Sequence, residues 1–165
     1  MRNAPPLLMP SDSRHDELRA GFNIALEHRP ARIVDATSVA DIVHAVDVAT
    51  HARRPVAVMN TGHGPSVAAN GAVLIRTGRM NRVNVDVRGR VAWIEAGATW
   101  REVIDAASRY GLAPLNGSSP HVGVVGYTLG GGVGLLARRL GFAADHVRSI
   151  DLVTADAETR HLTPE

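Results

Sequence analysis

Two glycine-bearing segments carry the residue types from which a ligand site could be built. Residues 58–66 read VMNTGHGPS, and residues 124–134 read VVGYTLGGGVG, with five glycines in eleven positions. Glycine loses the most backbone freedom on folding, so such a concentration needs a physical reason. Either a bulky ligand lies against a backbone without Cβ atoms, or one chain segment packs closely on another. The intervening Val, Leu and Tyr favour burial and argue against a flexible linker.

The first segment has the chemistry of an anion site. It directly follows an apolar run at 55–59 that predicts a buried strand, and its T-G-H-G-P turn presents backbone N–H groups that no large side chain covers. Successive amides of this kind form a nest that suits an anion such as a pyrophosphate. His63 lies between two glycines, so we expect its ring to be exposed and close to whatever binds. A surface histidine in a tight turn is an equally good interpretation of this loop alone.

The second segment also admits a nicotinamide-binding interpretation. Residues 132–137 fit G-x-G-x-x-A, and Asp151 follows at a suitable distance for a ribose ligand. That site needs a clean strand before the first glycine and a full helix after it. Here two more glycines interrupt the preceding run, and Gly141 stops the following helix. We therefore treat this as the weaker alternative.

The positions of these segments depend on a mixed set of helices and strands. Apolar runs predict strands at 31–36, 55–59, 72–76, 82–86, 90–96 and 147–156. Helices are expected at 14–28, from the N-cap Ser38, and from the capping box of Thr99 and Glu102 to Gly111. Gly89 is expected to supply the turn of a hairpin between 82–86 and 90–96. Because consecutive strands occur without helices between them, the predicted fold class is α+β.

Composition excludes several classes of function. The chain has 165 residues, a formal net charge of +2 and no Cys, and its 18 basic residues are all Arg. The absence of Lys excludes a Lys-dependent phosphate loop, and the absence of Cys excludes disulfides and thiolate chemistry. The arginines are scattered, so we expect no nucleic-acid partner. No metal ligands are predicted. Without a long apolar stretch we expect no membrane partner and a cytoplasmic location.

Across residues 20–157 the sequence resembles the FAD-linked oxidases of the vanillyl-alcohol oxidase and berberine-bridge-enzyme type. The similarity covers the G-H loop, VLIRTGRMNRVNVD, WIEAGATWREVIDAASRYGLAPLNG and SPHVGVVGYTLGGGVGLLARRLGFAADHVRSIDLVTAD, in order and at family-like spacing. It implies a PCMH-type FAD-binding domain at 14–165 behind a flexible arm at 1–13. A first αβ lobe would span 14–58, and a second lobe, 59–165, would be truncated.

The resemblance assigns the FAD-binding residues to the two glycine-bearing segments. In the first segment they are Met59, Asn60, Thr61, Gly62, His63, Gly64 and Ser66. In the second segment, which would lie along the flavin and its ribityl chain, they are Ser118, Ser119, Pro120, Val122, Gly123, Gly126, Tyr127, Gly130, Gly131, Gly132 and Gly134.

Departures from the family pattern limit what the resemblance implies. In many members the histidine that matches His63 is bonded covalently to the flavin's 8α-methyl carbon. Bicovalent members add a cysteine just before the proline that matches Pro120, and Ser119 stands there instead, which rules out a second link. Arg76 replaces a common Asp, with no evident role.

The function implied is oxidation of a small organic substrate by FAD, with oxygen as acceptor. No catalytic residue can be assigned, because the family's substrate side lies beyond the part that this chain matches. The alternative is a non-catalytic flavin-binding or interaction module. We expect the chain to form a homo-oligomer or to associate with a completing subunit.

Overall fold

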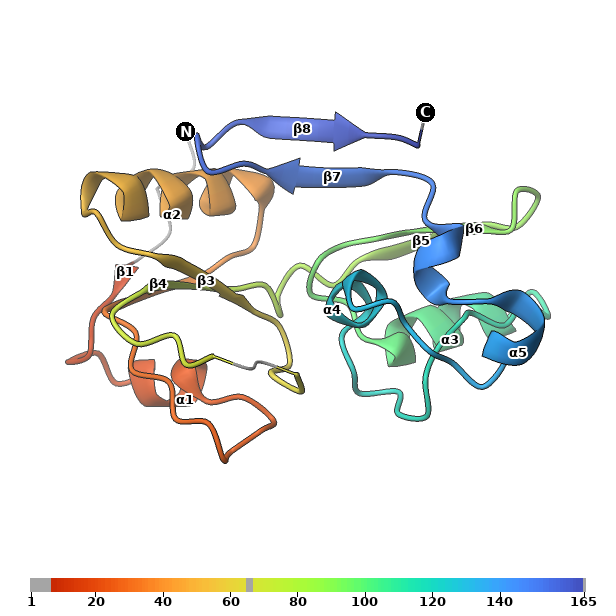
Figure 1. The fold of residues 1–165 in the computed structure, drawn as a ribbon, viewed down its shortest axis with the longest axis horizontal. Helices are drawn as coiled ribbons and strands as arrows, with labels where there is room; N and C mark the ends of the chain where they lie inside the picture. Colours follow the sequence, from red (N-terminus) through yellow and green to blue (C-terminus); the bar gives the residue numbers. More distant parts are fainter. Residues whose placement is uncertain (1–6, 65–66, 165) are drawn as a thin grey trace. The chain divides into compact units, whose positions relative to one another are not determined.

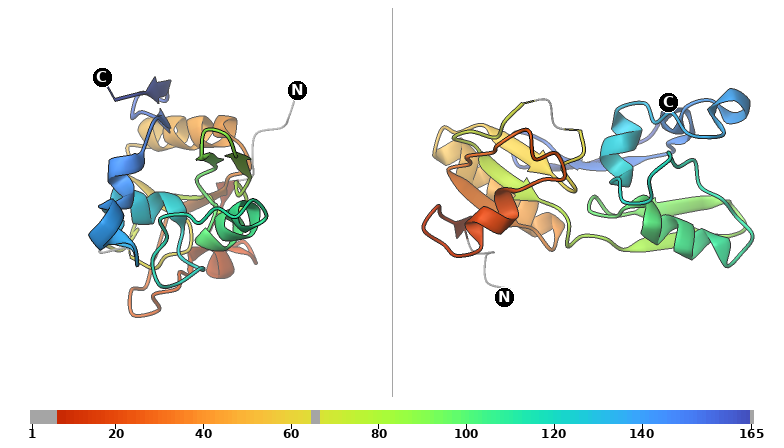
Figure 2. Two further views of the ribbon diagram at one scale, coloured as in Figure 1. Left: turned by 90° about the vertical axis from the view of Figure 1, so that its right-hand side faces the viewer. Right: turned by 90° about the horizontal axis from the view of Figure 1, so that it is seen from below.

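Two units make up the chain in the computed structural model, which describes residues 7–64 and 67–164 (Figures 1 and 2). Unit 1 comprises the described residues up to Arg79 and from Ser149 onward, and unit 2 is Met80–Arg148. Each unit combines helices with strands, which confirms the predicted α+β class.

Unit 1 is built on a four-stranded sheet in the order β1-β2-β4-β3. The strands are β1 (Leu7–Leu8), β2 (Arg32–Asp35), β3 (Val56–Met59) and β4 (Val73–Arg76). β2, β4 and β3 run parallel, so their last residues, Asp35, Arg76 and Met59, are in register at one edge of the sheet. Helix α2 (Val39–His51) covers one face of the sheet and the short helix α1 (His15–Arg19) lies on the other (Figure 1).

Local sequence signals place the best-defined elements of this unit. The hydroxyl of Ser38 accepts a hydrogen bond from the Asp41 amide at 3.3 Å, which confirms the predicted N-cap of α2. β4 lies between two parallel strands, and Val73, Leu74 and Ile75 are at most 1% exposed. The lobe boundary predicted between residues 58 and 59 falls within this sheet. Because β3 pairs with β4, unit 1 continues beyond that point.

Three predictions in unit 1 differ from the structure. The arm predicted at 1–13 contains β1, which pairs antiparallel with β2, while residues 1–6 lie outside the described part of the chain. The helix predicted at 14–28 ends at Arg19, because the following segment leaves the helix and packs on the loop after β3. β3 is an edge strand with Val56 and Val58 exposed, so the prediction of a buried strand at 55–59 was wrong.

The last strands of unit 1 form a hairpin. The strand predicted at 147–156 is β7 (Ile150–Val153), which pairs antiparallel with β8 (Thr159–Leu162). β8 was not predicted, because its exposed residues show no apolar alternation.

Unit 2 holds the hairpin of β5 (Val83–Asp86) and β6 (Val91–Ile94), followed by helices. These are α3 (Trp100–Ser108), α4 (Val124–Leu129), α5 (Ala137–Leu140) and a 3-10 turn at Ala143–His146. The predicted capping box of Thr99 and Glu102 is present at α3. The predicted turn of this hairpin is present at residues 87–90, where the Gly89 amide donates a hydrogen bond to Asp86 Oδ1 at 3.1 Å and Arg90 has a positive φ. Within the described residues, no helix is long and apolar enough to cross a membrane.

Candidate functional site

The loop at 59–64 leaves the carboxyl end of β3 in unit 1. Met59 is 5% exposed and packs in the core, and a Cβ atom on Gly62 would stand 3.1 Å from its Sδ. The Thr61 carbonyl accepts a hydrogen bond from the Phe22 amide at 2.9 Å, and the Gly62 carbonyl accepts one from the Asn23 amide at 3.0 Å. The loop is therefore anchored through its carbonyl groups.

Unlike these carbonyls, three backbone amides of the same loop have no hydrogen-bond partner among the described residues. Within the described residues, the N–H groups of Thr61, Gly62 and Gly64 donate no hydrogen bond. A Cβ atom on Gly64 would meet nothing within 4 Å, whereas one on Gly62, at φ +73°, would stand 2.6 Å from Gly21 Cα. Gly62 thus serves close packing, and Gly64 leaves open space. Unpaired amides beside an open backbone are what an anion needs.

His63 is held from two sides. Its Nδ1 lies 2.8 Å from Thr61 Oγ1, and its ring stacks on Phe22 with centroids 3.9 Å apart and an interplanar angle of 12°. The prediction of an exposed ring is thus modified, because Phe22 covers one face. Asn60 lies beside Gly78 at the end of β4, and Ser66 lies outside the described residues.

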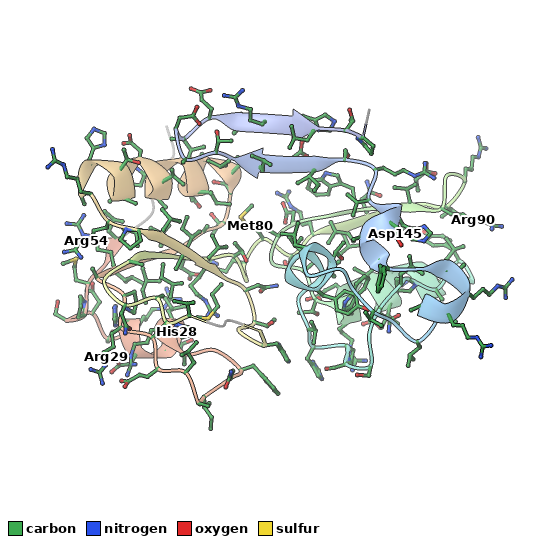
Figure 3. The ribbon with its side chains drawn as sticks, in the orientation of Figure 1. His28, Arg29, Arg54, Met80, Arg90 and Asp145 are labelled. Carbon is green, nitrogen blue, oxygen red and sulfur yellow. The ribbon has the colours of Figure 1, made fainter. Side chains whose placement is uncertain are left out.

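The buried side chain of His28 anchors the segment that leads from this loop to β4. Its ring is 3% exposed, and Nδ1 accepts a hydrogen bond from the Ala69 amide at 3.1 Å (Figure 3). Within the described residues, no cluster of His, Cys, Asp and Glu could hold a metal ion.

The first part of the second segment, 118–123, lies in unit 2 and is tied to α3. The carbonyls of Pro120 and Val122 accept hydrogen bonds from the first amides of α3 at 2.8 and 3.0 Å. Ser119 Oγ accepts one from the amide two residues later at 3.3 Å. Ser118 is exposed, and Gly123 is the N-cap residue of α4.

Several glycines of unit 2 make room for Tyr127. Cβ atoms on Gly117 and Gly132 would stand 3.0 and 2.7 Å from its ring, and one on Gly134 would stand 3.2 Å from its hydroxyl. The ring also meets Trp100 edge-on, with centroids 5.3 Å apart. The Tyr127 hydroxyl is buried without a hydrogen-bond partner in the described residues, and burial raises its pKa. Chain packing therefore accounts for these glycines.

Other glycines of the segment face open space. Cβ atoms on Gly126 and Gly131 would meet nothing within 4 Å, and one on Gly130 would make ordinary contacts at 3.5 Å. Gly126 is helical, so an alanine there would meet no backbone strain. Chain packing thus explains only some glycines of this segment, and the ligand explanation stays a prediction for those that face open space.

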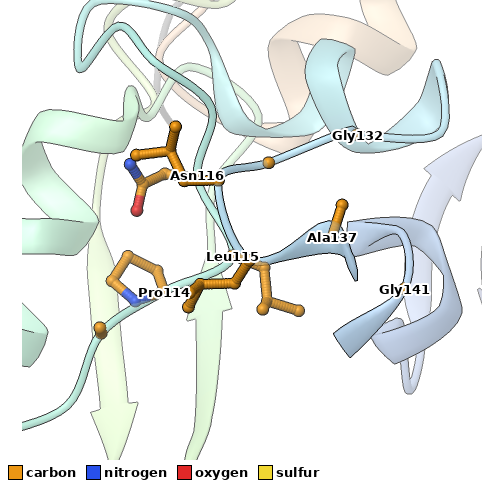
Figure 4. A pocket seen from close by; sticks show the side chains of 10 residues that line it. Pro114, Leu115, Asn116, Gly132, Ala137 and Gly141 are labelled. Atoms are coloured by element: carbon orange, nitrogen blue, oxygen red, sulfur yellow. The ribbon is translucent and has the colours of Figure 1, made fainter. Parts of the chain in front are cut away.

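An apolar pocket of about 260 Å³ lies beside this segment in unit 2 (Figure 4). The pocket lies between residues 113–116 and 132–141. Its lining includes Pro114, Leu115, Asn116 and Ala137, which are labelled in Figure 4. Whole-ligand pockets are usually about 300 Å³ or larger, so this one accommodates only part of a dinucleotide.

The nicotinamide alternative fails on local structure. The residues before its first glycine form α4 instead of a strand, and α5 is only four residues long. A dinucleotide fingerprint needs a strand–turn–helix at this place.

Sequence analysis missed the role of Gly21 and Phe22. Both residues lie inside the helix predicted at 14–28, although the segment A-G-F-N at 20–23 departs from helical composition. Their contacts with the loop join segments about 40 residues apart, which no local pattern reveals.

Comparison with known proteins identifies the family of this chain. The family model described as "FAD binding domain" matches residues 30–163. The chain belongs to this family. The FAD-linked oxidoreductase hasG of Aspergillus fumigatus is 40% identical over 129 residues, which are 77% of this chain and 28% of that protein.

Solved structures of the family have the same fold. The 6-hydroxy-D-nicotine oxidase of Arthrobacter nicotinovorans matches with a TM-score of 0.91 and 28% identity, over 96% of this chain and 36% of that one. Glucooligosaccharide oxidase from Acremonium strictum, which carries a 6-S-cysteinyl, 8α-N1-histidyl FAD, matches with a TM-score of 0.86 and 27% identity, over 96% and 34%. The chain spans about a third of the length of these relatives.

FAD is the cofactor of this FAD-binding domain. The residues present fit its parts. The amides of Thr61, Gly62 and Gly64, which have no partner among the described residues, suit a diphosphate. The open backbone at Gly126 and Gly131 suits a flat ring or ribityl chain. The amides belong to unit 1, and the open glycines belong to unit 2.

Proposed function

We propose that this chain supplies the FAD-binding part of an oxidase that oxidises a small organic molecule and passes the electrons to dioxygen. The observation that carries the proposal is the loop at 61–64. The carbonyls of Thr61 and Gly62 accept hydrogen bonds, whereas the amides of Thr61, Gly62 and Gly64 donate none within the described residues. The names of the related oxidases support dioxygen as the acceptor. FAD, when bound, supplies two-electron acceptance, and the residues described here bind and orient it.

His63 is the proposed anchor of a covalent flavin. If FAD is bound here, the His63 imidazole would exchange its N–H bond for an N–C bond to the 8α-methyl carbon, which would lose one C–H bond. The flavin, with dioxygen as the final acceptor, would supply the two-electron oxidation and take up the two protons that this link requires. The Thr61 hydroxyl and the Phe22 ring hold the imidazole in one orientation for this step. Since Ser119 stands where bicovalent relatives have cysteine, we propose a single link.

The test begins with absorbance of the purified chain and titration of the apo-protein with FAD. We expect a yellow protein, and in denaturing electrophoresis a fluorescent band that His63→Ala removes. A fluorescent band that survives His63→Ala would contradict the anchor. A colourless chain that does not take up FAD would favour the non-catalytic interaction module.

A further inference from the structure

Arg76 is a partly buried cation at the carboxyl end of β4, the strand next to the one from which the loop leaves. It ends β4, in register with Asp35 of β2 and Met59 of β3. Its Nη1 donates a hydrogen bond to the Ala20 carbonyl at 3.2 Å. The guanidinium has five N–H donors, and within the described residues it makes no other hydrogen bond and no ion pair.

The nearest carboxylate is already engaged by other arginines. Asp35 Oδ2 lies 2.9 Å from Arg14 and 3.8 Å from Arg79. Burial lowers the pKa of the Arg76 guanidinium, and the charge of Asp35 acts in the opposite direction without cancelling it. Three arginines thus surround one aspartate, and two positive charges remain in excess. A partly buried cation without a close counter-charge is costly, so the arrangement favours an anion.

The contact of Arg76 places it beside the loop. Ala20 precedes Gly21, whose backbone packs on Gly62, and the next amide donates to the Thr61 carbonyl. The guanidinium is therefore bonded to the same short segment that anchors the amide-bearing loop. Arg76 is also the register partner of Met59, from which the amide-bearing loop continues, so both stand at the carboxyl end of adjacent strands.

We propose that Arg76 is a diphosphate-binding residue, which pairs with the FAD pyrophosphate held by the amides of Thr61, Gly62 and Gly64. This inference rests on the FAD site proposed above. The two excess positive charges match the two negative charges of a diphosphate diester. This charge pairing makes the affinity of the chain for FAD depend on salt.

The test compares ligands with and without phosphate. Apo-protein with Arg76→Gln is titrated with FAD, riboflavin, ADP and adenosine, at low and high salt. A charge-assisted hydrogen bond predicts that affinity for FAD and ADP falls about tenfold or more, with a smaller salt dependence, while riboflavin and adenosine are unaffected. Arg76→Lys should restore part of the loss. Arg29→Gln is the matched control, because it removes an exposed arginine of unit 1 that pairs with Glu27.

Two results would overturn the proposal alone: unchanged FAD and ADP binding in Arg76→Gln, or an equal loss for all four ligands. The second would show that Arg76 only holds the segment at Ala20. Failure of the unaltered chain to bind FAD would overturn the site itself and this proposal with it.

Discussion

Alanine at Gly132 should destabilise unit 2 before any cofactor is added. The residue has φ +73°, which costs about 1–2 kcal/mol for a side chain. Its Cβ would stand 2.7 Å from both Ala143 Cβ and the Tyr127 ring, and relieving such overpacking costs about 1–3 kcal/mol. The sum, about 2–5 kcal/mol, corresponds to a fall in melting temperature of roughly 4–20 °C for a chain of this size.

Alanine at Gly126 should leave the apo-protein stable but weaken FAD binding. The position is helical and open, so alanine should stabilise the apo-protein by about 0.5–1 kcal/mol. Its Cβ would enter space assigned to the cofactor, so we expect FAD affinity to fall about tenfold or more.

Intrinsic fluorescence during urea unfolding measures both effects on stability, because both tryptophans, Trp93 and Trp100, lie in unit 2. FAD affinity is measured by flavin fluorescence on the same samples. Full stability of Gly132→Ala would refute the packing role. Undiminished FAD affinity in Gly126→Ala would show that the cofactor does not lie against α4.

Three further predictions test other parts of the chain. Thr61→Val should lower the yield of covalent flavin, measured by in-gel fluorescence, and Thr61→Ser should restore it, because only the serine can keep the hydrogen bond to His63. Burial raises the pKa of Glu102, but hydrogen bonds from Thr99 outweigh this and hold that pKa below 4.5. The capping box should therefore stabilise the chain above about pH 4.5 and lose this effect as the pH falls through the lowered pKa; urea unfolding of Glu102→Gln should lack that dependence. Light scattering should show association of the chain, and Leu135→Glu should reduce it, because Leu135 is 79% exposed.

Local signals predicted the elements that depend on a few neighbouring residues. The caps at Ser38 and Thr99 are each satisfied within three residues, so both helix starts were correct. β4 was recognisable because burial on both faces requires an apolar run. The exposure of β3 could not be predicted, because it depends on which strand occupies the sheet edge. The partner of β7 escaped prediction for a similar reason, since β8 has no buried face that would give it a pattern.

Glycine content indicated a site, but the sequence could not divide its glycines by role. Gly132 and Gly126 look alike in sequence, yet one adjoins the Tyr127 ring and the other adjoins open space. The difference depends on where residues from other segments lie, such as Ala143. The amides at 61–64 pose the same problem: a T-G-H-G turn offers N–H groups, but only the hydrogen bonds from residues 22 and 23 show that its carbonyls are engaged. Ligand-facing backbone is thus recognised by the internal contacts it lacks, and that property exists only in the folded chain.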